Sequence, residues 1–161
     1  MKWIFLLSIL FLAGFAGNAL AASACAGTRL NAGQINSTFI NKLLCASRPA
    51  ATSSIDRWAE EHLNQDQLFE HAKGSLDPID PRRLTGTWTK VNNCSGSLDC
   101  IRYDYGTGGI YTWSVWEESQ SSPSSATTLI YNFCSADGTT KIALGTVFAL
   151  PAVTAPNPCS Y

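Results

Sequence analysis

Residues 101–116, with the sequence IRYDYGTGGIYTWSVW, have the pattern of a β-hairpin. The first five of them alternate between apolar and polar side chains, which is the period of a half-buried strand. Four residues that include three glycines follow (106–109), and they suit a tight turn. The last seven are rich in aromatic and β-branched residues, which strands favour. This stretch therefore predicts an antiparallel sheet in the second half of the chain.

Five runs of this kind, separated by turn residues, lie between residue 86 and residue 150. The runs are Gly86–Val91, Ile101–Tyr105, Ile110–Trp116, Thr128–Cys134 and Lys141–Leu150. Because the connections between them are short, neighbouring strands are expected to be antiparallel. We therefore expect a β-meander of about five strands over residues 85–161.

Helical patterns are confined to residues 22–84. Over Asn31–Ala46, apolar residues recur at spacings of three and four, and Asn31 with Gln34 has the pattern of a capping box. A second helix is predicted over Ser54–Leu63. The predicted fold class is α+β, with two N-terminal helices packed on an antiparallel sheet of about five strands, and with disulfides as staples.

The first 21 residues have the features of a signal peptide. Lys2 supplies a positive charge, residues 4–15 are apolar, and Ala19-Leu20-Ala21 forms a small-x-small cleavage site. Residues 22–161 are then one globular domain, exported to the periplasm or the extracellular space. The apolar run is too short to span a bilayer, and no second run reaches its length, so the sequence predicts no membrane span.

Charge excludes nucleic acid as a partner. Without Lys2 the chain has ten Lys and Arg residues against twelve Asp and Glu residues, a net charge of −2. It has no basic patch of the kind that phosphate backbones require. The partner is then a small ligand, a glycan or a protein, and self-assembly stays open, because low charge also fits a subunit of an extracellular assembly.

Six cysteines in an exported chain predict a disulfide framework. Proximity along the chain favours the pairs Cys25–Cys45, around the first predicted helix, and Cys94–Cys100, across a short connection. Cys134–Cys159 is the remaining pair. An alternative for Cys25 is acylation, because Ala22-Ser23-Ala24-Cys25 has some likeness to a lipobox.

Aromatic residues of the predicted sheet are the candidate ligand contacts, since exposed rings on a rigid sheet can hold sugars or apolar molecules. The candidates are Trp116, Trp113, Tyr103, Tyr111 and, from the second predicted helix, His62. Rings in strands also serve as core, so both roles stay open. Trp116 is out of phase with Trp113 and is predicted to face outward.

Trp58, Glu60 and His62 form the most chemically loaded stretch. On a helix Trp58 and His62 share a face, while Glu60 is rotated by about 200° from Trp58. We therefore expect Trp58 to be buried between helix and sheet, and Glu60 to be solvated or paired with an arginine. His62 is expected to bond a backbone carbonyl or an acid within residues 77–80.

The chain lacks His-Glu-x-x-His, Cys-x-x-Cys and Gly-x-Ser-x-Gly motifs. The sequence therefore predicts no catalytic residue, metal or other cofactor. The leading hypothesis is a non-enzymatic module that binds a small molecule, a glycan or a protein. One alternative is a structural subunit of an extracellular or cell-surface assembly. A second is a hydrolase or metalloenzyme that uses Glu60 and His62.

Gly86-Thr87-Trp88 resembles the Gly-x-Trp motif in the first strand of lipocalins and avidins. That resemblance implies an eight-stranded barrel around a ligand. Only 73 residues follow Trp88, which is room for about five strands, so a closed barrel is not expected.

A longer pattern resembles an uncharacterised family of small exported bacterial proteins. It consists of a cysteine after a helical start, then Trp-x-Glu-x-His, Asp-Pro-x-Asp-Pro, Gly-x-Trp and a tyrosine-rich strand. The matching residues are Cys45, Trp58, Glu60, His62, Asp77, Pro78, Asp80, Pro81, Gly86, Trp88 and Tyr131-Asn132-Phe133-Cys134. The resemblance implies no particular activity.

Overall fold

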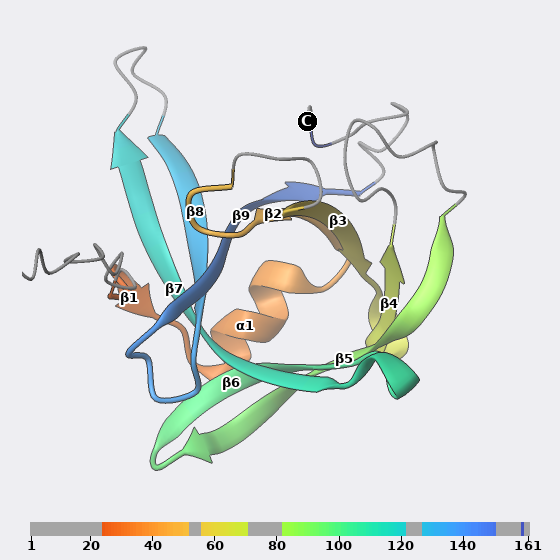
Figure 1. The fold of residues 1–161 in the computed structure, drawn as a ribbon, viewed down its shortest axis with the longest axis horizontal. Coiled ribbons are helices and arrows are strands. Elements are labelled where there is room, and N and C mark those ends of the chain that lie inside the picture. The colour runs from red at the N-terminus through yellow and green to blue at the C-terminus, as the bar shows by residue number, and fades with distance from the viewer. Residues whose placement is uncertain (1–23, 52–55, 71–81, 122–126, 151–158, 160–161) are drawn as a thin grey trace, which may run out of the picture.

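Strands dominate this chain, in its first half as well as its second. The computed structural model describes residues 24–51, 56–70, 82–121, 127–150 and 159. Eight strands form a closed antiparallel barrel (Figure 1). They are β2 (Lys42–Ser47), β3 (Arg57–His62), β4 (Gln67–Glu70), β5 (Arg83–Ser95), β6 (Leu98–Asp104), β7 (Ile110–Ser121), β8 (Thr127–Cys134) and β9 (Lys141–Ala149).

The barrel has an up-and-down order, because each strand pairs with the next one along the chain. Closure comes from β9, which pairs with β8 on one side and with β2 on the other. Lys42 lies opposite Ala149, and Ser47 lies opposite Leu144. A ninth short strand, β1 (Thr28–Arg29), adds to β7 outside the ring. Two 3₁₀ turns, η2 (Asn64–Asp66) and η3 (Gly106–Gly108), lie in connections.

The predicted α+β fold is wrong, although each of the five predicted strands overlaps one of β5 to β9. The first predicted helix is a helix only over α1 (Ala32–Phe39), and β2 follows it. In β2, Leu44 faces the barrel core and Leu43 packs in a second cluster with Ala59 on the outer face. Because both faces are buried, the apolar run shows no period of two that would mark it as a strand.

The second predicted helix is strand β3. Its inward side chains are Trp58, Glu60 and His62, while Ala59 and Glu61 point to the outer face. The inward side chains are an aromatic ring, an acid and an imidazole. Apolar and polar residues therefore do not alternate along this strand, and hydrophobicity alone does not identify it. Its backbone finds hydrogen-bond partners in β2 and β4, and those tertiary pairings decide the structure.

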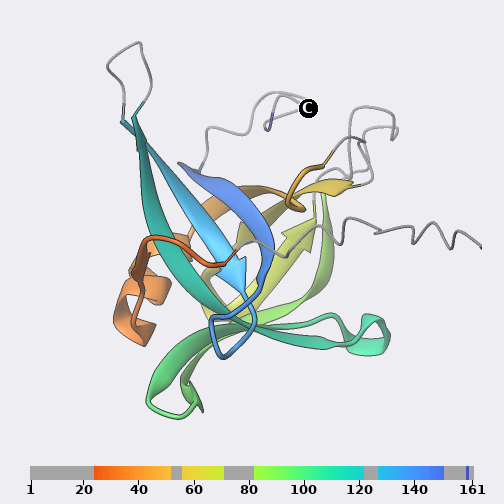
Figure 2. The ribbon, with the colours of Figure 1, turned by 60° about the vertical axis from the view of Figure 1, so that its left-hand side comes forward.

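Helix α1 closes one end of the barrel. Asn31 caps it, and the predicted capping box with Gln34 is confirmed. Ile35 and Phe39 are fully buried, and the Phe39 ring contacts the rings of His62 and Phe133. In Figure 1 the strands surround α1 in projection, and in Figure 2 α1 stands at the side of the ring. The helix is therefore a plug at one end of the barrel.

The expectation that the chain is too short for a barrel is wrong, because three barrel strands precede Trp88. The Gly-x-Trp motif lies on β5, the fourth strand, rather than on the first. A Cβ atom on Gly86 would collide with the carbonyl oxygen of Asp104, so glycine allows β5 and β6 to approach closely. Trp88 is buried and donates from Nε1 to the carbonyl oxygen of Leu63 at 3.1 Å.

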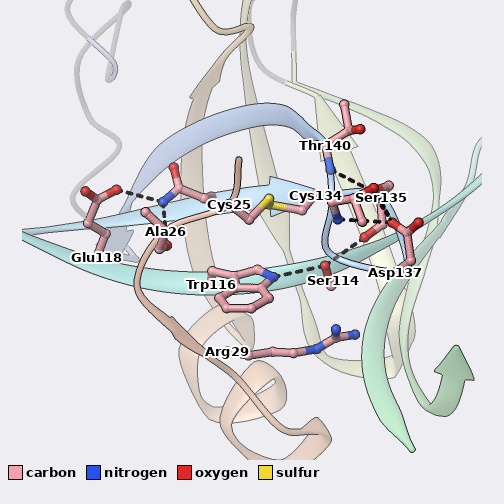
Figure 3. Close-up of a disulfide and its surroundings, with 12 residues drawn as sticks. Cys25, Ala26, Arg29, Ser114, Trp116, Glu118, Cys134, Ser135, Asp137 and Thr140 are labelled. Carbon is pink, nitrogen blue, oxygen red and sulfur yellow. Dashed lines mark hydrogen bonds between the residues drawn. A yellow bond between two sulfur atoms is a disulfide. The ribbon is translucent and has the colours of Figure 1, made fainter. Parts of the chain in front are cut away.

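Three disulfides staple the barrel, and one predicted pair, Cys94–Cys100, is confirmed. The other two predicted pairs are wrong, since the structure joins Cys25 to Cys134 and Cys45 to Cys159. Figure 3 shows Cys25 lying across β8, where Asn132 donates to the carbonyl oxygen of Ala26 at 3.1 Å. Because Cys25 is bonded to Cys134, it has no free thiol for acylation.

The Cys45–Cys159 disulfide joins residues that closure of the barrel brings together. Cys45 lies opposite Ala59 on β3 and opposite Thr146 on β9. With Leu43 and Ala59 it forms the outer cluster, against which Leu150 and Cys159 pack. The predicted signal peptide, residues 1–21, lies outside the described residues.

Candidate ligand-binding cavity

The end of the barrel opposite α1 holds a cavity of about 1180 Å³. Its aromatic walls come from three places in the chain: Trp58 on β3, Tyr105 directly after β6, and Tyr111 and Trp113 on β7. The Tyr111 ring centroid lies 5.9 Å from that of Tyr105 and 5.9 Å from that of Trp113. Tyr105, Tyr111 and Trp113 therefore form a continuous apolar surface, and Trp58, on β3, also lines the cavity.

A buried acid, Glu60, lies among these rings, and a second acid, Glu70, lines the cavity nearer its rim. Only 5% of the surface of Glu60 is exposed, yet Glu60 lines the cavity. The Tyr105 hydroxyl donates to Oε1 at 2.6 Å, and Trp58 donates from Nε1 to Oε2 at 3.2 Å. Because Trp58 and Glu60 are two residues apart on one strand, their side chains lie on the same face and can bond.

Burial raises the pKa of Glu60 to about 7, because the carboxylate loses water that would stabilise its charge. The hydrogen bonds from Tyr105 and Trp58 favour the charged form and offset part of this effect, while nearby Glu70 adds to it. The expectation that Glu60 is solvated or paired with an arginine is wrong. Near neutral pH Glu60 exists in both its protonated and ionised forms.

A second polar pair lies deeper in the barrel, below the cavity. His62 is fully buried, and its Nε2 is 3.0 Å from the hydroxyl oxygen of Tyr103. Burial lowers the pKa of His62 to about 3, so the imidazole is neutral at physiological pH. The side-chain partner of His62 is a tyrosine, which the sequence did not predict, and a hydrogen bond with the backbone of Glu60 opposes the lowering of its pKa. The expected acid within residues 77–80 lies outside the described residues.

The rim of the cavity carries charged and apolar side chains. Arg83 pairs with Glu70 at 2.9 Å, and Arg48 lies 3.8 Å from Asp56. Lys141 also lines the rim. Leu84, Tyr111 and Ile142 are lining residues with large exposed apolar surfaces, and the equally exposed Ile110 is next to Tyr111. An entrance with both charged and apolar side chains leads to aromatic walls and a buried acid.

The structure brings together two of the five predicted ligand contacts, Trp113 and Tyr111, at the cavity wall. Tyr103 and His62 lie one layer deeper and support the wall, since the Tyr103 ring packs on Trp113 with centroids 5.2 Å apart. Trp116 lies elsewhere: its Nε1 donates to Ser114 Oγ at 3.1 Å, and the Arg29 guanidinium carbon is 5.9 Å from its ring centroid (Figure 3).

Most lining residues were not predicted as ligand contacts, and Trp58, Glu60 and Tyr105 are the most important of these. The interpretation of residues 54–63 as a helix separated Trp58 from Glu60. The signal that could have found them is the spacing of two between Trp58, Glu60 and His62, which on a strand places all three on one face.

Comparisons with family models, curated proteins and solved structures find no match for this chain. Among the described residues, no helix has the length and apolar character needed to cross a membrane.

Proposed function

We propose that this protein is an exported module that binds a small molecule inside its barrel. The observation that carries the proposal is the cavity of about 1180 Å³ at the open end, with aromatic walls and one buried acid. Eight-stranded barrels have interiors that side chains fill or that hold one small ligand. A space of this size, with a few polar groups among rings, has the composition of a ligand site.

The three disulfides support the exported part of the proposal, because such bonds persist in oxidising compartments. They also hold the scaffold around the cavity in one geometry, which lowers the entropic cost of binding.

The apolar residues at the rim support entry of a ligand with an apolar body. Leu84 is 57% exposed and Ile142 is 38% exposed, and both line the cavity. Together with the aromatic walls and the concave form of the site, these residues favour a ligand that fits inside the cavity over a glycan or a protein. We therefore propose a small molecule as the ligand.

Dye binding, with and without a substitution that fills the cavity, tests the proposal. The uncharged dye N-phenyl-1-naphthylamine should bind the purified protein saturably, one molecule per chain, with an increase in its fluorescence. Thr85→Trp places a large ring at a lining position and should weaken binding of the dye at least tenfold.

The matched control is Thr87→Trp, two residues further along the same strand, at an exposed position outside the cavity lining. It should bind the dye like the parent protein. Equal weakening by both substitutions, or no saturable binding by the parent, would contradict a ligand site in the barrel.

The cavity favours ligand binding over a purely structural role, because a structural subunit does not need a cavity. It also favours binding over a hydrolase or metalloenzyme built on Glu60 and His62. Glu60 bonds Tyr105 and Trp58, whereas His62 bonds Tyr103 one layer below. The two groups therefore serve different neighbours rather than one reacting atom.

A further inference from the structure

The geometry points to a ligand that carries a positively charged amine, held by Glu60 and the aromatic walls of the cavity. This inference rests on the proposed function and narrows it to cationic ligands with an apolar or aromatic body. It is carried by the position of one carboxyl group and by the rings around it.

Glu60 is a buried acid without a cation beside it. Its described partners are the neutral donors Tyr105 and Trp58, and no lysine or arginine among the described residues forms an ion pair with it. Each carboxylate oxygen accepts one of these bonds and can accept at least one more. Buried carboxylates usually have a cationic partner, because an isolated buried charge is costly. A bound ammonium group would supply that partner.

The rings around Glu60 suit a cation as well. Trp58, Tyr105, Tyr111 and Trp113 line the same cavity. The faces of aromatic rings are electron-rich and attract ammonium groups, and aromatic cages recognise cationic ligands in this way. An ammonium group that donates hydrogen bonds to Glu60 would therefore be surrounded by groups that stabilise its charge, while the apolar part of the ligand contacts the remaining wall.

Three cationic residues line the cavity and would repel a cationic ligand, but two of them are paired with acids. Arg83 pairs with Glu70 at 2.9 Å, and Arg48 pairs with Asp56 at 3.8 Å. Lys141 has no ion pair among the described residues and would favour an anion. It lies at the half-buried rim, where water weakens its field, whereas Glu60 is buried and its charge acts in a lower dielectric.

Three probes with the same ring system test the inference: tryptamine, a cation; tryptophol, which is uncharged; and indole-3-acetate, an anion. Each is titrated against the protein with N-phenyl-1-naphthylamine bound, at pH 8, where Glu60 is ionised. Tryptamine should displace the dye at a concentration at least tenfold below that of either other probe.

Glu60→Gln should remove the preference for tryptamine and leave the displacement by tryptophol within about twofold. Retained binding of dye and tryptophol shows that the variant is folded with its cavity intact. The matched control is Glu61→Gln, at the neighbouring position on the outer face, where Glu61 pairs with Arg82. This control should keep the preference.

The outcomes separate the two proposals. Dye binding with equal displacement by the three probes, or with no displacement by tryptamine, would overturn the amine inference and leave the ligand site in place. Stronger displacement by indole-3-acetate would also overturn it and assign recognition to Lys141. If the parent protein does not bind the dye, the proposed function itself fails, and this inference fails with it.

Discussion

At the scale of single residues, Glu60 sets a pH dependence that belongs to the folded state. Its pKa is about 7 in the barrel and near 4.5 in the unfolded chain. Between these values the folded protein holds a proton that the unfolded chain has lost, so the contribution of Glu60 to stability falls as pH rises from about 4.5 to about 7. The loss is about 3 kcal/mol. His62, with its lowered pKa, has the opposite dependence over part of this range.

Comparison with Glu60→Gln isolates the contribution of this residue, because His62 is the same in both proteins. The free energy of unfolding of the variant, relative to the parent, should rise by about 3 kcal/mol between pH 4.5 and pH 8. Urea denaturation at a series of pH values measures the difference. A difference that stays constant with pH would show that the carboxyl is solvated in the folded protein.

At the scale of elements, packing of its apolar face on the barrel stabilises α1, because a helix of eight residues is too short to be stable alone. Phe39 is fully buried and packs on His62, Tyr131 and Phe133. Its contacts attach the helix to the barrel and seal that end.

Phe39→Ala should lower the free energy of unfolding by about 3–5 kcal/mol, because it leaves a cavity among these rings. Ser37→Ala, at an exposed position on the same helix, should change it by less than about 0.5 kcal/mol. Urea melts of both variants measure the effects. If Phe39→Ala melts like the control, the helix does not plug the barrel.

At the scale of the whole molecule, the two long disulfides differ from the short one in what they restrain. Cys45–Cys159 spans 114 residues, and Cys94–Cys100 spans six. With Cys25–Cys134 intact, the shortest path from Cys45 to Cys159 is still about 45 residues. A closed loop of that length restricts the unfolded chain more than a loop of six.

Replacing Cys45 and Cys159 together with alanine should therefore cost about 4 kcal/mol, and replacing Cys94 and Cys100 together about 2 kcal/mol. Denaturation of the two double variants under non-reducing conditions measures the costs. Equal costs, or a larger cost for the short loop, would show that local contacts and not chain restriction dominate.

Features encoded within a few neighbouring residues were determined by the sequence alone. The alternation in residues 101–105 and the glycines of 106–109 predicted β6, its turn and β7. The Asn31–Gln34 pair predicted the start of α1, and six residues of separation predicted Cys94–Cys100. In each case the interaction that stabilises the feature lies within the segment itself.

The barrel and its cavity were decided by tertiary structure. Strands β2 and β3 have side chains buried on both faces or polar groups that face inward, so no local period distinguishes them from helices. Strand β2 bonds to β9, which lies at the far end of the chain, and β3 bonds to β4, which was not predicted as a strand. The same closure pairs Cys45 with Cys159 and sets Glu60 beside Tyr105. A strand satisfies its backbone only through other strands, and this is why the pairing, the Cys45–Cys159 disulfide and the candidate site emerge together when the barrel closes.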